Sequence, residues 1–272
     1  MQIARSPTRP KTLDYIADML EPWVELHGDR AYGDDAAMVG GVGSLGGRSV
    51  VVVGHQRGGD TRENLVRNFG MPHPEGYRKA RRLMELAAKF HLPLITFIDT
   101  PAADPGMESE ERGQAQAIAA NLYTLASLPT PVVVTVIGEG GSGGALAIGV
   151  GDRIHMLENS VYSVASPEAS AAILWHNAAL APEAAETMKI TAPDLFGFGI
   201  VDKVIPEPPA GAHTDPTSVL VAVQAALVAA LHELETEYGT DTGYDEARLL
   251  ADRAEKYRLI GRWQESSAAV PW

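Results

Sequence analysis

Three different chemistries fit one glycine-rich segment of the sequence, GEGGSGGA at 138–145. Its first glycine starts a G-x-G-x-x-G pattern, which in dinucleotide-binding folds holds a pyrophosphate at the start of a helix. The segment also contains G-x-S-x-G around Ser142, the pattern of a serine nucleophile on a strand-to-helix turn. Its backbone N–H groups could instead form an oxyanion hole without any side-chain nucleophile. A purely structural explanation is a glycine turn that lets a helix pack closely on a sheet.

Sequence context weakens the first two interpretations. A dinucleotide loop normally follows the first strand of its fold, whereas this segment follows several predicted elements. The acidic residue at the ribose-binding distance, Glu158, comes after a further predicted strand. A Ser…Asp…His order can be drawn with Ser142, Asp202 and His213. Because eight histidines in 272 residues make such a match easy to find, a serine hydrolase is an alternative rather than the favoured hypothesis.

Charged residues outside this segment suggest further sites, each with an ordinary structural explanation. Seven cations could contact phosphate groups or an acidic partner, namely Arg57, Arg62, Arg67, Arg78, Lys79, Arg81 and Arg82. The helical ones also fit a solvated basic face with pairs such as Arg81 and Glu85, so we assign a function only to Arg57. The acidic run at 108–111 fits the first turn of a helix, where carboxylates complement the helix dipole. His155 is expected to be packed or exposed rather than a ligand, and we predict no metal site.

Composition limits the class of protein further. The 272 residues include 22 Lys and Arg against 35 Asp and Glu, a net charge of −13, and no cysteine. Without thiols the chain has no Cys nucleophile, disulfide or Cys-based zinc site. Its acidity disfavours nucleic acid and anionic membranes as partners. The first residues contain no apolar signal-peptide core and no apolar run reaches about 18 residues, so we expect a cytoplasmic protein that does not span a membrane.

The elements that would position the glycine segment alternate between strands and helices. From residue 37 the pattern predicts a β-hairpin with Gly46 and Gly47 in its turn. Buried strands are predicted at 92–99 and 131–138, and short strands at 153–157, 161–165 and 200–205. Helices are predicted from 74, at 110–128, after Ser166, at 182–189, from 215 and at 244–261. This alternation predicts an α/β fold with parallel βαβ units. We expect one domain over 1–272, with a helical lead-in at 1–35 that Pro22 interrupts and a helical C-terminal arm at 214–272.

Several strings in the sequence closely resemble the α subunit of bacterial acetyl-CoA carboxylase carboxyltransferase. The longest are GHQRGGDTRENLVRNFGMPHPEGYRKARRLMELAAKF (54–90) and PVVVTVIGEGGSGGALAIGVGDRIHML (131–157). Shorter ones are RPKTLDYI (9–16), FIDTP (97–101), EERGQAQAIAANL (110–122), YSVASPE (162–168), AAILW (171–175), KITAPDL (189–195) and VIPEPPAGAH (204–213). The resemblance extends over about residues 4–213 and outweighs the generic motif matches.

This resemblance implies the crotonase (ClpP-like) fold, built from ββα spiral units, and an enzyme that works with a β subunit of related fold. Carboxylated biotin on a separate biotin carboxyl carrier protein would deliver its carboxyl group to acetyl-CoA or a related acyl-CoA. Biotin is then the implied cofactor, α2β2 the implied assembly, and zinc, which needs Cys ligands, would lie on the β subunit. The alternative is a stand-alone crotonase-like enzyme or a serine acyl hydrolase using Ser142.

The resemblance also implies which residues act. The α subunit of this family binds the biotin oxygen through backbone N–H groups, here those of Gly143, Gly144 and Ala145. No nucleophile or general base is needed, because the biotin nitrogen itself can remove the α-proton of the thioester. Residues implied to bind substrate are Ala102, Asp104, Gly106, Gly140, Gly141, Arg57, Ser166 and Glu168.

This sequence departs from the family beside that site. The family carries TPGAYPG where this chain has TPAADPG (100–106), so Ala102 and Asp104 replace a Gly and a Tyr. In addition, SPEGCASILWK has become SPEASAAILWH (166–176), and HQKGRD has become HQRGGD (55–60). A methyl group narrows a backbone approach, and an ionised Asp is unfavourable beside an apolar acyl chain unless it is hydrogen-bonded. We therefore expect the acyl preference to differ from acetyl.

Overall fold

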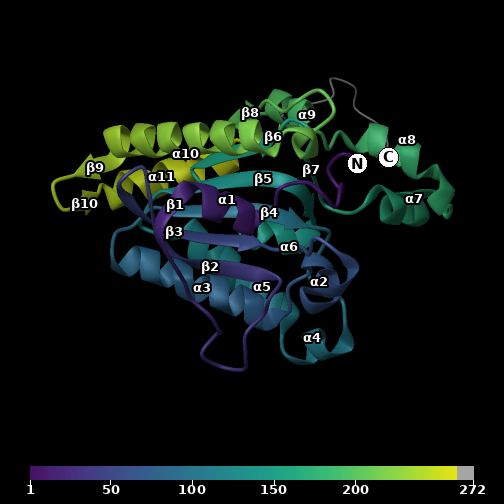
Figure 1. Ribbon diagram of the computed structural model, residues 1–272, viewed down its shortest axis with the longest axis horizontal. Helices are drawn as coiled ribbons and strands as arrows, with labels where there is room; N and C mark the ends of the chain where they lie inside the picture. Colours follow the sequence, from purple (N-terminus) through teal and green to yellow (C-terminus); the bar gives the residue numbers. More distant parts are fainter. Residues whose placement is uncertain (262–272) are drawn as a thin grey trace, which may run out of the picture.

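An eight-stranded sheet forms the centre of the molecule in the computed structural model, which describes residues 1–261 (Figure 1). The strands are β1 (Leu20–Glu25), β2 (Met38–Leu45), β3 (Arg48–His55), β4 (Leu94–Thr100), β5 (Val132–Gly141), β6 (Arg153–Leu157), β7 (Val161–Ser163) and β8 (Lys203–Ile205). Their order is β1-β2-β3-β4-β5-β6-β8, and β7 pairs with the end of β5. The first three strands are antiparallel and the others parallel, which confirms the predicted α/β class.

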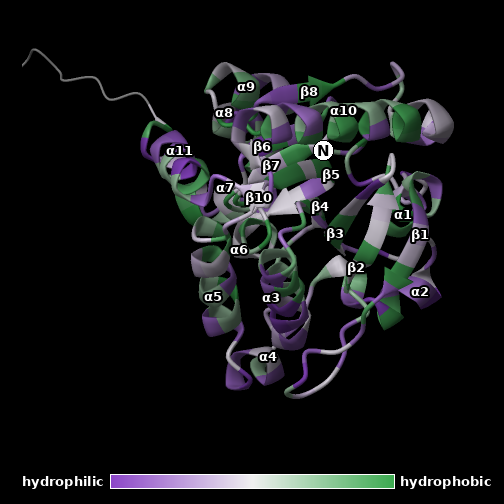
Figure 2. Ribbon diagram, turned by 90° about the vertical axis from the view of Figure 1, so that its left-hand side faces the viewer, coloured by the Kyte–Doolittle hydropathy of each residue, from purple (hydrophilic) through white to green (hydrophobic). Residues whose placement is uncertain are grey.

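Helices cover both faces of this sheet. The helices of residues 1–261 are α1 (Thr12–Met19), α2 (Thr61–Val66), α3 (Pro74–Lys89), α4 (Met107–Glu111), α5 (Gln114–Ala126), α6 (Ser142–Leu146), α7 (Pro167–Trp175), α8 (Ala181–Met188), α9 (Ala192–Gly197), α10 (Pro216–Tyr238) and α11 (Glu246–Arg258). Short 3₁₀ turns are η1 (Asn68–Gly70), η2 (Ala178–Leu180) and η3 (Ala212–Thr214), and β9 (Gly239–Thr240) pairs with β10 (Gly243–Tyr244). Figure 2 shows α10 above the sheet and α3 and α5 below it.

The strands divide their side chains between two cores because successive residues of a strand point to opposite faces. In β3, Val50 and Val52 join the core beneath α1 and α10. Val51 and Val53 join the core beneath α3 and α5. All four are buried, which explains why the strand appears in the sequence as an uninterrupted apolar run.

Several local predictions are confirmed. Strands β2 and β3 pair as a hairpin across Gly46 and Gly47, both of which have positive φ. Helix α3 begins at Pro74, as predicted, and Tyr77, Ala80, Leu83, Met84 and Ala87 on one of its faces are fully buried. Ser166 caps α7, because its hydroxyl accepts a hydrogen bond from the N–H of Ala169.

Three differences from the prediction have physical causes. The chain continues after α1 as the edge strand β1, whose pairing with β2 is irregular around Pro22. An edge strand tolerates proline there because one side of it needs no ladder donors. The helix predicted at 110–128 is two helices, α4 and α5, separated by Gly113 with a φ of 82°. Helices α2 and α9 were not predicted, since six residues are too few to show a helical period.

In the predicted C-terminal arm, α10 packs on the sheet, and α11 packs against α10 and α5. Among the described residues, α10 is the one helix that is long and apolar enough to cross a membrane by length and composition. Its inward face, including Leu227, Leu231 and Leu234, is buried in the core that it shares with the sheet. This packing identifies α10 as a core helix. The part of the predicted arm at 262–272 lies outside the described residues.

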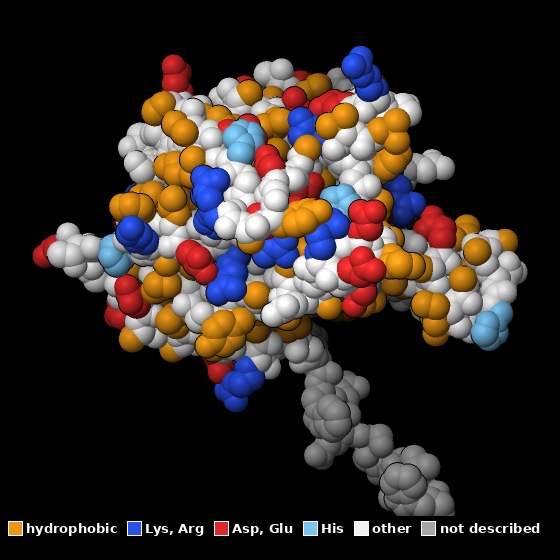
Figure 3. All heavy atoms as spheres, turned by 90° about the horizontal axis from the view of Figure 1, so that it is seen from below, with side chains coloured by type: hydrophobic (Ala, Val, Ile, Leu, Met, Phe, Trp, Pro, Cys, Tyr) orange, Lys and Arg blue, Asp and Glu red, His pale blue; other side chains and the backbone are white. Residues whose placement is uncertain are grey.

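One segment projects from the body. Helices α7 and α8 and the turn η2 between them pack mainly against one another, at the right of Figure 1. We call residues 167–188 the projecting hairpin. Large apolar side chains on it face solvent: Ile173 is 70% exposed and Leu174 66%. Figure 3 shows hydrophobic side chains spread over this projection, which no other described element covers.

Candidate active site at the glycine turn

The glycine segment forms the turn between β5 and α6, where β5 leaves the centre of the sheet. Strand β5 ends at Gly141, and α6 begins at Ser142, whose φ of 56° lies in the left-handed region. This strand-turn-helix geometry is the one that G-x-S-x-G predicts. The N–H groups of Gly143 and Gly144 belong to the first turn of α6, where backbone donors have no acceptor within the helix, and Ala145 follows them. We call residues 141–145 the glycine turn.

The same geometry contradicts the dinucleotide interpretation. Gly138 and Gly140 lie inside β5, and Gly140 is paired with Thr100 of β4 and Tyr162 of β7. A pyrophosphate loop needs its glycines in a turn beyond the strand. The glycine at 138 is explained by packing instead, because a Cβ there would overlap the carboxylate of Asp99.

Close packing also explains two glycines of the turn itself. A Cβ on Gly141 would overlap the carbonyl of Pro101, and a Cβ on Gly144 would lie 2.6 Å from the carbonyl carbon of Ala102. Gly143 is different, because the nearest atoms to a Cβ there would be 3.8 Å away on Ile118. The packing explanation therefore holds for 141 and 144 but does not require glycine at 143.

A cavity of about 270 Å³ opens beside Gly143. It is lined by Ser142, Gly143, Leu146, Tyr162, Ser163, Val164, Leu195 and Ile200. Burial raises the pKa of Tyr162 above its ordinary value. A mainly apolar wall with backbone N–H groups at one edge suits a ligand that has an apolar body and one polar acceptor.

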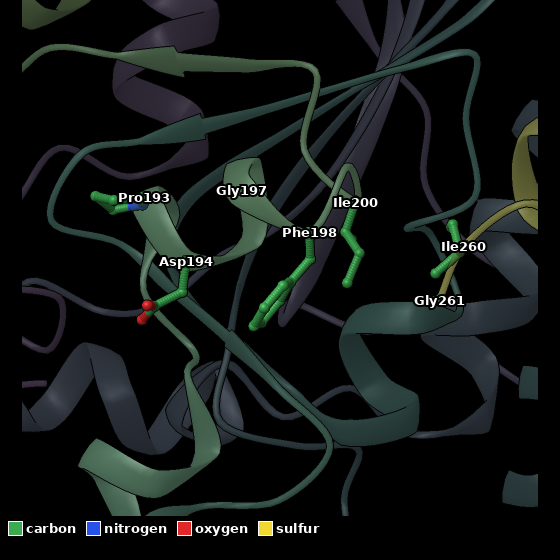
Figure 4. A pocket seen from close by; sticks show the side chains of 7 residues that line it. All are labelled: Pro193, Asp194, Gly197, Phe198, Ile200, Ile260 and Gly261. Carbon is green, nitrogen blue, oxygen red and sulfur yellow. The ribbon is translucent and has the colours of Figure 1, made fainter. Parts of the chain in front are cut away.

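A larger cavity of about 670 Å³ shares Ile200 with the first. It is lined by Pro193, Asp194, Gly197, Phe198, Ile200, Ile260 and Gly261. Phe198 and Ile200 project in the same direction, and Ile260 lies across from them (Figure 4). Asp194 accepts a hydrogen bond from Thr191 at 2.6 Å. Since the residues of the glycine turn line only the smaller cavity among these two, we place the candidate site there.

The loop after β4, residues 101–106, forms the wall behind the glycine turn. Thr100 Oγ1 donates to the carbonyl of Ala102 at 2.6 Å, and the peptide between Ala102 and Ala103 lies directly against Gly144. Gly106 at the other end of the loop caps α4. The structure thus brings Ala102, a predicted site residue, into contact with the turn.

Asp104, in the same loop, is hydrogen-bonded through both carboxylate oxygens. Oδ1 accepts from Asn68 Nδ2 at 2.9 Å, while Oδ2 accepts from Ser109 Oγ at 2.6 Å and from the N–H of Gly106 at 3.0 Å. His73 Nδ1 lies 3.3 Å from Oδ2. Burial alone would raise the pKa of Asp104, but the hydrogen bonds from Ser109, Asn68 and Gly106 outweigh it and lower the pKa. The negative charge is therefore compensated within the protein.

Ion pairs connect two other predicted site residues, Arg57 and Glu168. Arg57 Nη1 lies 3.4 Å from Asp99 Oδ1 and 3.6 Å from Glu139 Oε2. Arg5 bridges Glu139, at 2.6 Å, and Glu168, at 3.0 Å. Burial raises the pKa of Asp99, and the charge of Arg57 opposes that rise. Arg57 therefore compensates carboxylates at the end of β5, and Arg5 ties the start of the projecting hairpin to the same strand.

His55 is a buried histidine beneath the turn. It is 0% exposed. Burial lowers its pKa to about 3, although the carbonyls of Gly144 and Phe97 favour the charged form. The ring is therefore neutral at physiological pH and does not supply a proton there.

The histidine and carboxylate proposed for a serine triad are not brought together. Asp202 Oδ2 accepts from the N–H of Ile154 at 2.6 Å and also pairs with Lys256. The Nδ1 atom of His213 is buried without a hydrogen-bond partner. Ser142 is exposed at the turn, and the Asp–His pair that would activate it does not form.

The other charged candidates occupy structural positions. Lys79 was predicted on the basic face of α3, but it is 1% exposed and pairs with Asp34, so that prediction is wrong at this position. Arg81 pairs with Glu85 at 2.9 Å, as predicted. The acidic run at 108–111 lies in α4, where it complements the helix dipole. Within residues 1–261, no three His, Asp or Glu side chains gather as a metal site.

His155 is packed in β6, and its surroundings explain its ionisation. It is 3% exposed, and burial lowers its pKa to about 4. Glu158, which follows the same strand, accepts the N–H of Glu207 at 3.1 Å. Neither residue is placed to bind a ribose or a metal.

Sequence reasoning missed several residues of this site. The cavity is lined by Tyr162, because β7 pairs with the end of β5. It is also lined by Leu195 of α9 and by Ile200, which follows α9. Arg5 reaches the site from the N-terminal segment. No spacing in the sequence predicts these contacts. Glu139 is different, because it lies inside the glycine motif and could have been singled out from the sequence.

The chain matches the family described as acetyl co-enzyme A carboxylase carboxyltransferase-like over residues 1–261. It is 55% identical over 263 residues to the acetyl-coenzyme A carboxylase carboxyl transferase subunit alpha of Listeria welshimeri, covering 97% of this chain and 80% of that one. The subunit of the same name from Halalkalibacterium halodurans is 55% identical over 270 residues, covering 99% and 81%.

Solved structures share the fold at lower identity. A chain of transcarboxylase 12S with methylmalonyl-coenzyme A bound superposes with a TM-score of 0.69 at 20% identity, covering 84% of this chain and 42% of that one. The Pseudomonas malonate decarboxylase MdcD–MdcE hetero-dimer gives a TM-score of 0.63 at 19% identity, covering 83% and 91%. These similarities confirm the predicted crotonase fold.

Proposed function

The chain belongs to the acetyl-CoA carboxylase carboxyltransferase-like family, and from that premise we propose that its glycine turn forms the biotin-binding half of a shared active site. Its activity is that of an α subunit, carboxyl transfer to acetyl-CoA or a related acyl-CoA. The observation that carries this assignment is 55% identity over nearly the whole chain. An α subunit acts with a β subunit, so the stand-alone hydrolase is not favoured.

The cavity beside the turn fits the carboxyl donor. When bound, carboxybiotin would supply the carboxyl group and a basic ureido nitrogen. The N–H groups of Gly143, Gly144 and Ala145 would hold its ureido oxygen and stabilise negative charge there. Leu146 and Val164 form an apolar wall that is exposed in the isolated chain, so a partner seated over it would exclude water and strengthen those hydrogen bonds.

Preorganisation of donors is the main catalytic contribution that this chain makes. One oxyanion-hole donor is worth about 2.7–4 kcal/mol in other enzymes. The backbone of the turn is fixed by its contact with the loop at 101–106, so little reorganisation accompanies the reaction. A neutral His55 and an unactivated Ser142 support a mechanism in which protein side chains transfer no proton.

The projecting hairpin is the surface on which we place the β subunit. Exposed side chains such as Ile173 and Leu174 form an apolar surface that stays in water when the chain is alone. Val164, which is 81% exposed, links this surface to the cavity that it also lines. A subunit seated there would cover the hairpin and bring its own half of the site to the glycine turn, burying well over about 1,000 Å².

The remaining features of the assembly follow the same proposal. The complex is an α2β2 hetero-oligomer in the cytoplasm, and the biotin is carried on a separate biotin carboxyl carrier protein. Zinc resides on the β subunit, since this chain has no cysteine. Residues 1–272 act as one carboxyltransferase domain.

The test is reconstitution. Co-expressed with its β subunit and mixed with a carboxylated biotin carrier, the chain is expected to co-purify and to transfer the carboxyl group in an acyl-CoA-dependent reaction. The acyl-CoA product is measured by mass spectrometry, and a β-subunit-free preparation is the control. A monodisperse monomer that is fully active alone would contradict the shared site.

A further inference from the structure

We propose that Asp104 is a positioning residue for carboxyl transfer: its carboxylate clasps the loop at 101–106 and thereby fixes the glycine turn. This inference rests on the proposed function, in which the N–H groups of the turn bind the ureido oxygen. It assigns Asp104 a role different from selecting the acyl group, the role that its place in the sequence had suggested.

The clasp is the carboxylate of Asp104 with its contacts to Asn68, His73 and Ser109, and it connects segments that are far apart along the chain. Asn68 comes from η1, His73 from the start of α3 and Ser109 from α4, and all three lie around the carboxylate of Asp104. Ser109 Oγ also lies 2.8 Å from His73 Nδ1, so its hydroxyl joins the histidine to the carboxylate. The side chain of Asp104 is only 13% exposed. One carboxylate thus holds the end of the loop to three elements.

The backbone of the same residue is held as well. The N–H of Asp104 donates to the carbonyl of Pro72 at 3.0 Å. Gln114 Nε2 donates to the carbonyl of Asp104 at 3.0 Å and to that of Pro72 at 2.9 Å. Together, the hydrogen bonds of the Asp104 side chain and main chain fix the position of the loop relative to α3 and α5.

That position is passed directly to the glycine turn. The peptide between Ala102 and Ala103, two residues before the clasp, lies so close to Gly144 that no side chain fits between them. A hydrogen bond weakens steeply when its donor is turned away from the acceptor. A loop released at Asp104 is therefore free to move the Gly144 N–H off the line to the ureido oxygen.

A carboxylate is well suited to holding this loop, because the groups around it are hydrogen-bond donors. It offers two acceptor oxygens, and the donors here are an amide, a hydroxyl and a backbone N–H. With both oxygens in use, Asp104 has little capacity left for a substrate group. The expected signature of its loss is slower chemistry with little change in acyl-CoA binding.

Asp104→Ala in the reconstituted complex tests the clasp, with Asp29→Ala as the matched control. Asp29 is also a buried carboxylate that holds a loop, through the N–H groups of Ala31, Tyr32 and Gly33 and the side chain of Arg78, but not the loop at the glycine turn. We expect Asp104→Ala to lower kcat at least 10-fold with KM for the acyl-CoA within threefold. Asp29→Ala should leave kcat within twofold, even where it lowers Tm equally.

Two further measurements separate the clasp from general destabilisation and from the assigned reaction. Ser109→Ala should lower kcat less than Asp104→Ala, and the double variant should match Asp104→Ala alone, because both changes break one cluster. Hydrogen–deuterium exchange of the peptide at 139–146 should be at least 10-fold faster in Asp104→Ala and unchanged in Asp29→Ala, whether or not the assay shows activity. Unchanged kcat or exchange in Asp104→Ala overturns the clasp, whereas an inactive wild-type complex counts against the proposed function alone.

Discussion

The glycine turn and the projecting hairpin are close along the chain, yet their packing is opposite. At the turn, Gly141 and Gly144 lie so near the loop at 101–103 that a Cβ would overlap its backbone. On the hairpin, Ile173 and Leu174 are more than half exposed. One region is fixed by its own chain, and the other has apolar surface that no element of residues 1–261 covers.

The difference follows from what each region has to do. Donors that stabilise a developing charge must already be in place when the charge appears, so the turn needs rigid support. A subunit interface has to remain exposed until the partner binds, so the proposed function accounts for apolar side chains of the hairpin in water. Under that proposal the chain would complete its own half of the chemistry and depend on its partner for the other half.

Gly144→Val should have the largest effect, because it attacks the fixed region. Its side chain would overlap the peptide between Ala102 and Ala103, so the turn must shift and its N–H groups with it. Carboxyl transfer should fall at least 100-fold, about 2.7 kcal/mol of transition-state stabilisation, in kcat/KM of the reconstituted complex. Gly143→Ala is the companion variant: a Cβ has room there, so Tm should hold while the narrower cavity lowers activity. Near-wild-type turnover of a folded Gly144→Val protein would refute this placement of the site.

Ile173→Asp with Leu174→Asp should have the next largest effect and tests the exposed region. Charges in a covered apolar interface are unfavourable, so β-subunit binding should weaken about 30-fold, roughly 2 kcal/mol. The isolated chain should keep its Tm, because neither side chain is buried in it. Val221→Asp on α10, at an exposed position, serves as the control and should bind normally. If the wild type, the double variant and Val221→Asp bind the β subunit with equal affinity in a titration, the interface does not lie on the projecting hairpin.

The same contrast explains what the sequence could and could not predict. The hairpin turn at Gly46 and Gly47 and the start of α3 at Pro74 were predictable, because special backbone angles and helix starts select particular residues. Strand β1 was not, since Pro22 indicates a break and only pairing with β2 makes a strand there. Turns and helix starts depend on the residues that form them, whereas the pairing of a strand depends on other parts of the fold.

The site divides in the same way. The glycine turn was found from its spacing, because a tight strand-to-helix turn needs small residues in a fixed order. The cavity walls at Tyr162 and Ile200 and the donors around Asp104 come from segments tens of residues away. Periodicity and motifs carry no information about those contacts, so the sequence suggested a substrate role for Asp104 where the structure shows hydrogen bonds within the protein.

Substitutions in the loop at 101–106 should have a smaller effect on activity. They test whether two residues of this loop, Ala102 and Asp104, have different roles. The double variant Ala102→Gly with Asp104→Tyr restores the family's residues, and we expect the kcat/KM ratio of acetyl-CoA to longer or hydroxylated acyl-CoAs to rise about 10-fold, since one group shifts selectivity by about 1–3 kcal/mol. The single variants separate the two roles. Ala102→Gly should change the ratio, whereas Asp104→Tyr should slow every acyl-CoA alike. A ratio that stays within twofold in the double variant means that this loop does not set specificity.

Ser142→Ala should have the smallest effect, and it decides whether the turn is an oxyanion hole or a nucleophile elbow. If Ser142 only shapes the turn, kcat/KM should change less than about threefold, whereas loss of a true nucleophile costs several orders of magnitude. Stability supplies an independent readout. Ser142 holds a φ of 56°, so Ser142→Gly should relieve strain and raise stability by about 1 kcal/mol in thermal unfolding, while Ser142→Ala keeps the strain. Covalent labelling of Ser142 by a fluorophosphonate, together with inactivity of the Ala variant, would favour the hydrolase. A stabilised and fully active Gly variant would show that the chemistry of this turn resides in its backbone.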